Sequence, residues 1–288
     1  MVCHLKNEVL NVIIKPEGAE LTSIKDKAGH EYLWQADPSV WSRHAPVLFP
    51  IVGALKNGSY CYEGTEYSLS QHGFARDSLF TVIRASDLEA EFQLKSDART
   101  LTNYPFEFDF RVIYRLEGSQ LMTRFEVYNL GDRDMLFSVG GHPAFNLNWL
   151  TGDSIDDYYL EFDQSETLNV WQLEDSLLAE NPKPFLDQER IIQLSSSTFD
   201  HDALIFLEHN SGIVSLCHKR TSRRISVNIS GFPHLGIWSK PGAPYVCIEP
   251  WQGHVDPTDH SGQFEDKPGI VRLCKGGHYS AEFSVTIT

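Results

Sequence analysis

Phe106-Glu107-Phe108-Asp109-Phe110-Arg111-Val112-Ile113-Tyr114 is the clearest strand pattern in the chain. Phe106, Phe108 and Phe110 fall on one face of an extended chain, because successive side chains of a strand point to opposite faces. The charged residues between them fall on the other face. This alternation predicts a strand with one side on a hydrophobic core. Residues 120–128 form a second expected strand after the turn Leu116-Glu117-Gly118-Ser119. The two strands predict an antiparallel hairpin.

The rest of the chain repeats this signal in short apolar or alternating runs, separated by Gly, Pro, Asn and Asp. Further strands are expected at residues 8–14, 21–24, 30–34, 60–69, 79–84, 91–95, 135–139, 203–207, 213–217, 225–229, 235–238, 245–249 and 279–287. Residues 151–203 are less regular and acidic, with strands expected only at 170–173 and 191–194. The apolar stretch 46–53 lies between prolines and predicts a buried loop or a short edge strand.

Neither a long amphipathic helix nor a short-period repeat is apparent between these strands. Many short strands without intervening helices predict antiparallel sheets packed face to face. No change in composition marks a domain boundary. We therefore expect an all-β fold, with residues 1–288 forming a single large antiparallel β-sandwich domain.

Composition and charge exclude several classes of function. The formal net charge of −15 disfavours binding to nucleic acid or to an anionic membrane surface. No apolar run approaches the roughly 18 residues that a membrane span requires, and the N-terminal residues lack the pattern of a signal peptide. The five cysteines are scattered and never spaced C-x-x-C. They predict reduced thiols in a cytoplasmic protein. The protein is expected to be a monomer or homodimer.

Tyr245-Val246-Cys247-Ile248-Glu249-Pro250-Trp251 brings a carboxylate to the end of an apolar run. Pro250 has no N–H to donate and is expected to end the strand at Glu249. A carboxylate beside Trp251 is expected to be partly dehydrated. Dehydration raises the pKa of a Glu toward neutrality, where it acts as a base. On this stretch alone, a strand-end Glu that points into water is an equally simple interpretation.

Two of the twelve histidines follow expected strands in glycine-rich surroundings. His72 lies in Ser70-Gln71-His72-Gly73-Phe74-Ala75-Arg76-Asp77, where Gly73 permits close backbone approach and Arg76 supplies a cation. His142 lies in Val139-Gly140-Gly141-His142-Pro143-Ala144-Phe145-Asn146. A single loop histidine is usually a structural hydrogen-bonding residue. Together with Glu249, however, two imidazoles that titrate near neutrality predict a site that moves protons at pH 7.

These same stretches resemble the three signature motifs of the aldose 1-epimerase (galactose mutarotase-like) family, and most closely its LacX-like branch. The motifs are His72-Gly73-Phe74-Ala75-Arg76, Gly141-His142-Pro143-Ala144-Phe145-Asn146 and Glu249-Pro250-Trp251-Gln252-Gly253. They occur in the family's order, and the match covers nearly the whole chain. The resemblance implies a β-supersandwich with an open groove. It also implies interconversion of the α and β anomers of an aldose sugar without a cofactor or metal.

The resemblance also implies a role for each matching residue. Glu249 matches the general base that takes the proton of the anomeric hydroxyl, and His142 the general acid that protonates the ring oxygen. His72 matches a second imidazole that hydrogen-bonds the ring oxygen. Asp202 resembles an acid that binds sugar hydroxyls, although a turn residue at a strand entry is its alternative. Substrate-binding arginines are expected at Arg76 and, by a looser match within Trp41-Ser42-Arg43-His44-Ala45-Pro46, at Arg43.

Other functions remain open on the sequence. A catalytically silent sugar-binding or sugar-sensing protein has the same fold, with Trp41, Trp149, Trp238 or Trp251 stacking on a sugar or packing in the core. A phosphosugar mutarotase would use Arg43 and Arg76 on the phosphate. A metal site in His254-Val255-Asp256-Pro257-Thr258-Asp259-His260 has no recognised spacing, so a solvated turn is expected there. A glycoside hydrolase needs two carboxylates, and only Glu249 is well motivated, with Asp202 as a weak second.

Overall fold

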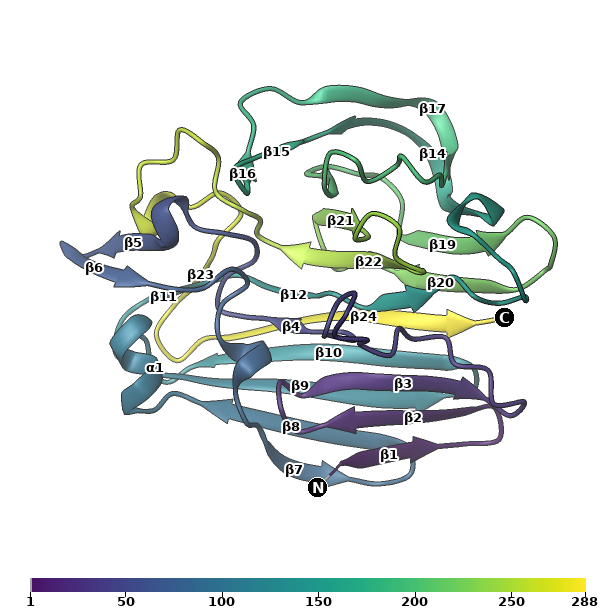
Figure 1. Ribbon diagram of the computed structural model, residues 1–288. Helices are drawn as coiled ribbons and strands as arrows, with labels where there is room; N and C mark the ends of the chain where they lie inside the picture. The colour runs from purple at the N-terminus through teal and green to yellow at the C-terminus, as the bar shows by residue number, and fades with distance from the viewer. Residues whose placement is uncertain (1) are drawn as a thin grey trace.

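The chain folds into antiparallel sheets, two of them large, as the computed structural model of residues 2–288 shows (Figure 1). The larger sheet has nine strands in the order β17-β14-β19-β20-β24-β10-β9-β8-β7. The second has six, with β18-β21-β22-β12-β4 in order and β13 also paired to β22. A three-stranded sheet, β1-β2-β3, contacts the larger sheet where β1 meets β8. The predicted all-β architecture is confirmed.

The strands of the nine-stranded sheet are β7 (Thr81–Ala85), β8 (Glu89–Lys95), β9 (Phe108–Glu117), β10 (Gln120–Asn129), β14 (Tyr158–Val170), β17 (Lys183–Gln193), β19 (Ile213–His218), β20 (Arg224–Asn228) and β24 (His278–Ile287). Those of the six-stranded sheet are β4 (Val47–Leu48), β12 (Val139–Gly141), β13 (Ala144–Asn146), β18 (Leu204–Phe206), β21 (His234–Trp238) and β22 (Tyr245–Gln252). The three-stranded sheet contains β1 (Cys3–Lys6), β2 (Leu10–Lys15) and β3 (Glu20–Asp26).

Smaller elements connect these sheets. Three two-stranded ribbons are formed by β5 (Ser59–Tyr62) with β6 (Thr65–Ser68), β11 (Met135–Phe137) with β23 (Val271–Leu273), and β15 (Leu173–Glu174) with β16 (Leu177–Leu178). The described residues include one short α-helix, α1 (Ala98–Asn103), and 3₁₀ turns at Lys56–Gly58, Ala75–Asp77, Ile155–Asp157 and Phe264–Asp266. No helix in residues 2–288 is long and apolar enough to cross a membrane. All five cysteines are free thiols.

The hairpin predicted from residues 106–114 and 120–128 is formed by β9 and β10, which pair from Glu117 with Gln120 onward. Phe110 of β9 faces the core and stacks on Phe49, directly after β4, with ring centroids 4.3 Å apart. The opposite face is less exposed than the alternation suggests. Asp109 there is buried and paired with Arg111. The nine-stranded and six-stranded sheets therefore share an aromatic core at this hairpin.

The structure corrects several strand predictions. Residues 151–203 contain two long strands, β14 and β17, where we expected only short ones. Acidic and polar residues conceal their alternation, and the register between them shifts at a bulge after Glu161. Residues 30–34 form isolated bridges, at Glu31 and Leu33, in place of the expected strand. Residues 60–69 form the β5–β6 hairpin. The short edge strand expected within residues 46–53 is confirmed as β4.

The backbone of β12 lies close to the larger sheet at Gly141 and is paired on both sides within its own sheet. A Cβ atom on Gly141 would lie 2.8 Å from the ring of Phe283 in β24, so a larger residue there would have to displace this ring. The backbone of β12 also pairs with β4 on one side and β22 on the other. His142, the next residue, is therefore held by backbone that is fixed on three sides.

A buried carboxylate ties the three-stranded sheet to the segment before β4. Glu20 is 2% exposed, accepts hydrogen bonds from the backbone N–H groups of His44 and Ala45 at 2.8 and 3.1 Å, and pairs with Lys15. Burial alone would raise the pKa of Glu20. The hydrogen bonds and charge from His44 and Lys15 outweigh burial and lower the pKa to about 2. The ionised form of Glu20 therefore stabilises the fold.

Glu20→Gln is expected to destabilise the protein in a pH-dependent way. A depressed pKa gives stability that is present above the unfolded-state pKa and is lost as the pH falls through the folded-state pKa. The shift corresponds to about 3 kcal/mol at pH 7 and roughly half of that at pH 3. Urea unfolding of both proteins across this range measures the difference. Glu8→Gln, in an exposed pair with Lys27, is the control and should have little effect. A pH-independent difference would contradict an ionised Glu20.

Candidate active site

A cavity of about 830 Å³ lies against the six-stranded sheet. Its walls include five of the six residues that the sequence singled out: His72, Arg76, His142, Asp202 and Glu249. They come from segments nearly 180 positions apart in the chain, so the fold brings them together. The volume lies in the upper part of the range of about 300–1,000 Å³ that is usual for small-molecule sites.

Glu249 lies inside β22, and the predicted strand end at this residue is wrong. Pro250 pairs with Leu235 of β21, and β22 continues to Gln252. Ile248, two positions before Pro250, donates its N–H to the carbonyl of Pro143 at 3.3 Å. Since residues two apart in a strand present their backbone groups to the same side, the nitrogen of Pro250 also faces that side. In the register of Gly140 with Trp251, the residue opposite Pro250 is Gly141, the last residue of β12, so the missing N–H falls where the ladder between β12 and β22 ends.

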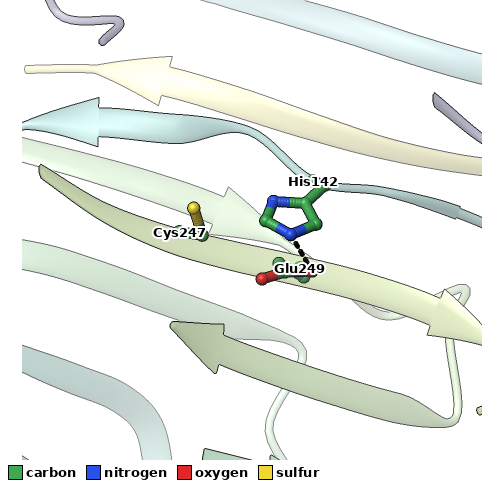
Figure 2. A group of neighbouring side chains, drawn as sticks. All are labelled: His142, Cys247 and Glu249. Carbon is green, nitrogen blue, oxygen red and sulfur yellow. Dashed lines mark ion pairs between the residues drawn. The ribbon is translucent and has the colours of Figure 1, made fainter. Parts of the chain in front are cut away.

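The pairing of strands places His142 directly opposite Glu249. On β22, Trp251 pairs with Gly140 of β12 and Cys247 pairs with Ala144 of β13. Both short strands keep one register, and the residue midway between Gly140 and Ala144 is His142. Its Nε2 atom lies 3.2 Å from Oε2 of Glu249, as Figure 2 shows. Strand pairing on both sides of His142 and Pro143 therefore sets the contact.

Burial changes the proton affinity of both partners. Glu249 is 1% exposed although its carboxylate lines the cavity. Its burial raises its pKa well above the usual value, Trp251 acts in the opposite direction, and the charge of Asp202 raises the pKa further. This direction agrees with the prediction for Glu249. Burial lowers the pKa of His142 far below the usual value for histidine. The expectation of an imidazole that titrates near neutrality is therefore wrong, because local sequence carries no measure of burial.

His72 is fixed by two hydrogen bonds to Gly53. The N–H of Gly53 donates to Nδ1 of His72 at 3.1 Å, and the N–H of His72 donates to the carbonyl of Gly53 at 2.8 Å. Because Nδ1 accepts, the ring proton of neutral His72 is on Nε2. Burial, His142 and the nearby arginines lower the pKa of His72 well below its usual value. This imidazole is therefore a neutral donor, with its ring centroid 5.6 Å from that of His142.

The turn that carries His72 needs the glycine that follows it. Gly73 has φ of 71°, and a Cβ atom there would lie 2.3 Å from the carbonyl oxygen of Phe49. His72 itself has φ of 64°, in the left-handed region that favours glycine. The close approach inferred for Gly73 from the sequence is confirmed. It holds the His72 turn against the segment that follows β4.

The two candidate arginines occupy different environments. Arg76 lines the cavity, and its Nε atom is buried without a hydrogen-bond partner. Burial and the charge of Arg43 lower the pKa of Arg76 to about 10. Arg43 is outside the cavity wall and forms an ion pair with Asp77 at 2.9 Å. Nε of Arg76 lies 3.7 Å from Oδ2 of Asp77, without a hydrogen bond, so Arg76 keeps its donors for a ligand. The structure does not bring Arg43 into the site.

Asp202 and three tryptophans complete the wall. Asp202 lines the cavity in a left-handed conformation, with φ of 71°. Trp41, Trp238 and Trp251 also line it. Trp41 stacks on the ring of His142 with centroids 5.1 Å apart. Trp149, in contrast, is buried against Tyr158 and His218. Gln71 and Lys240 reach the cavity as well, and no local motif identified them.

The stretch 254–260 is neither a solvated turn, as we expected, nor a metal site. Asp256 is 1% exposed and its Oδ1 atom accepts a hydrogen bond from Nζ of the buried Lys267 at 2.6 Å. The ammonium group thus occupies the position that a cation would take beside this carboxylate. Asp256 also accepts the N–H of Lys56 and contacts His260. The partner that decides its burial, Lys267, lies eleven residues away and outside the motif.

Comparisons with known proteins show the family of the chain. The family model described as aldose 1-epimerase matches residues 1–286. The plasmid-encoded protein LacX of Lactococcus lactis subsp. lactis is 36% identical over 297 residues, which cover 100% of this chain and 99% of the relative. A galactose mutarotase related enzyme from Lactobacillus acidophilus is 39% identical, with a TM-score of 0.95 over 100% of this chain and 97% of its own. A galactose mutarotase-like protein from Lactobacillus casei is 30% identical, with a TM-score of 0.92 over 100% of both chains.

Proposed function

Because the chain belongs to the aldose 1-epimerase family, we propose that it interconverts the α and β anomers of an aldose by acid–base ring opening and closure. The observation that carries this proposal is the contact of 3.2 Å between Glu249 and His142 in the wall of the cavity. Ring opening removes a proton from the anomeric hydroxyl and delivers one to the ring oxygen. Two groups that share one proton meet this requirement without net exchange with water.

The proton count of the pair fits the reaction in both directions. A neutral Glu249 and a neutral His142 together hold the same number of protons as a carboxylate and an imidazolium. Transfer of one proton from Glu249 to His142 produces the carboxylate base and the imidazolium acid that ring opening needs. After the carboxylate takes the hydroxyl proton and the imidazolium protonates the ring oxygen, the pair is neutral again. Burial favours the neutral form of both residues. It therefore stabilises the form of the pair that is present while the sugar is open-chain.

The remaining residues have binding roles in this scheme. The fixed Nε2–H of His72 donates to the ring oxygen, where negative charge develops as the C1–O5 bond breaks. Asp202 and Arg76 offer an acceptor and donors to sugar hydroxyls. Trp41 and Trp238 supply aromatic faces for the apolar C–H surface of a pyranose. The cavity has room for substituents beyond a single ring, so the geometry leaves the identity of the aldose open.

Anomer exchange in several sugars tests the proposal. Freshly dissolved α-glucose and α-galactose, followed by polarimetry or by NMR exchange between anomers, should equilibrate faster with the protein than without it. Equilibrium binding of the same sugars is measured in parallel. Binding without acceleration would refute the enzymatic proposal and support the sugar-sensing alternative. Equal rates with and without protein for every aldose, together with no binding, would reject both.

A phosphorylated aldose is a second candidate substrate, and one observation favours it. Arg76 is mostly buried in the cavity wall, and its Nε atom has no hydrogen-bond partner. A guanidinium group in this state suits a phosphate oxygen. Comparison of kcat/KM for glucose and glucose 6-phosphate distinguishes the two. A preference for the phosphosugar that Arg76→Met abolishes would support this candidate, whereas equal values for both sugars would count against it.

His72→Asn is expected to lower kcat/KM by about 10²–10³-fold, the usual cost of losing one fixed donor to a developing negative charge. The loss should fall mainly on kcat, because the donor is needed most when the ring bond breaks. Steady-state kinetics on the best substrate measure the split between kcat and KM. A higher KM with unchanged kcat would assign His72 to ground-state binding alone. His201→Asn, another histidine of the cavity wall, is the matched control.

A further inference from the structure

Cys247 adds a third side chain with a metal-binding group to the Glu249–His142 pair. Its sulfur, a carboxylate oxygen of Glu249 and a ring nitrogen of His142 all lie within 4.8 Å of one another. Cys247 and Glu249 are two positions apart on β22 and therefore project from the same face. Figure 2 shows the thiol beside the imidazole, which is turned toward the carboxylate. All three residues are buried.

The ligand atoms are close to the spacing that a tetrahedral ion requires. Thiolate, imidazole and carboxylate are the three ligand types that Zn²⁺ takes in proteins, at about 2.0–2.3 Å. Two ligand atoms on one tetrahedral Zn²⁺ are then roughly 3.5 Å apart. Nε2 of His142 and Oε2 of Glu249 already lie 3.2 Å apart. A displacement of the Cys247 sulfur by about 1 Å, through rotation of its side chain, would bring all three ligand atoms to this spacing.

Two further features favour an ion at this place. Oε2 of Glu249 is buried, and its contact with Nε2 of His142 at 3.2 Å lacks the angles of a hydrogen bond. The cluster also opens on one side only, because His142 and Glu249 line the cavity while Cys247 lies below them. Trp41, Tyr245 and Trp238 surround it with aromatic rings. Three protein ligands in an apolar setting, with a fourth position open to the cavity, are the arrangement of an open zinc site.

We propose that Cys247, His142 and Glu249 form a binding site for Zn²⁺ that inhibits anomer exchange by occupying the acid–base pair. The metal site stands on the geometry alone, whereas the inhibition rests on the proposed function. The ion takes the Nε2 atom and the carboxylate oxygen that the reaction uses, so the bound metal and proton transfer exclude each other. Binding displaces the protons of the thiol and the carboxyl group to solvent and changes no oxidation state.

Cobalt spectroscopy tests the site without reference to activity. The protein is freed of metal with a chelator and titrated with Co²⁺, which reports bound thiolate by a charge-transfer band in the near ultraviolet. We expect this band in the wild type and in Cys274→Ala, which removes an exposed cysteine. It should be absent from Cys247→Ala and from Cys247→Ser, the second variant in case the first does not fold. A wild type without the band, or a band that survives in a folded Cys247 variant, would overturn the site.

Zinc inhibition tests the consequence. In the wild type, added Zn²⁺ should abolish anomer exchange, and a chelator should restore it. Cys247→Ala should keep its basal activity, because the thiol takes no part in proton transfer. Its inhibition constant should rise by at least about 10-fold, the lower end of what a lost supporting partner costs a metal site. Equal zinc sensitivity in Cys247→Ala and the wild type would refute the inhibitory role. If no aldose is turned over, the cobalt spectra still decide the site, and only the inhibition is refuted.

Discussion

Glu249→Gln is expected to leave a folded protein in which anomer exchange is slower by about 10²–10⁴-fold, the usual contribution of a general acid–base group. Gln has the shape of Glu and cannot accept the proton. Burial of the carboxylate already opposes its charged form, so the substitution should cost little stability. Rates from polarimetry and unfolding curves from circular dichroism measure the two effects separately. Glu208→Gln, outside the cavity, is the matched control.

The double variant Glu249→Gln, His142→Asn sharpens this test. In the proposed reaction the two residues exchange one proton across 3.2 Å, so removal of either disables the pair. The double variant should therefore be about as slow as the slower single variant, because groups that act as a unit have non-additive effects. Rate losses that multiply would show independent roles. Unchanged turnover in Glu249→Gln would refute the assignment of the base outright.

Lys267→Met is expected to destabilise the protein by about 3–5 kcal/mol, the cost of leaving a buried charge without its partner. Lys267 is fully buried and donates to Oδ1 of Asp256 at 2.6 Å and to the carbonyl of His254 at 2.8 Å. With methionine in its place, the carboxylate of Asp256 stays buried and loses its main counter-charge. Urea unfolding at pH 7 measures the loss. The exposed Lys27, paired with Glu8, is the control, and Lys27→Met should have no measurable effect.

Replacement of both partners distinguishes a buried charge from simple loss of packing. Lys267→Met combined with Asp256→Asn should be more stable than Lys267→Met alone, because no uncompensated charge remains. Asparagine also keeps an acceptor for the N–H of Lys56. A double variant less stable than the single one would contradict this account. The single variant should also slow anomer exchange, since Asp256 anchors the segment from Gly53 to Lys56 that fixes His72.

The sequence predicts a strand correctly where its alternation of apolar and polar residues matches one buried face and one exposed face. The β9–β10 hairpin follows from alternation, because one face of it is packed on the core. The strands β14 and β17 do not, because Glu161, Glu166 and their acidic neighbours conceal the apolar positions. Glu166, for example, is fully buried and accepts the N–H groups of Asn210 and Ser211. No local pattern indicates that distant backbone will satisfy a buried carboxylate.

The candidate site was predictable in its residues but not in its physics. The motifs around His72, His142 and Glu249 identify side chains that the structure brings to one cavity. Their proton affinities depend on burial, and burial depends on strands far away in the sequence. The end of β22 was misplaced for the same reason, since the missing N–H of Pro250 matters only if a partner stands opposite. Cys247 looked like one apolar residue of a strand, and only its position beside His142 gives it a possible ligand role.

The matched positions of Glu249 on β22 and His142 between β12 and β13 have a consequence for how such a site diversifies. Adjacent strands are spaced about 4.8 Å apart by peptide hydrogen bonds, whatever side chains they carry. The gap between acid and base is therefore set by the backbone and is independent of the segments that border the sugar. Insertions or deletions around Trp41, Asp202 or Lys240 can adapt the cavity to a new substrate while the reaction geometry stays unchanged. A one-residue deletion between Gly140 and Ala144 would instead separate the pair at once.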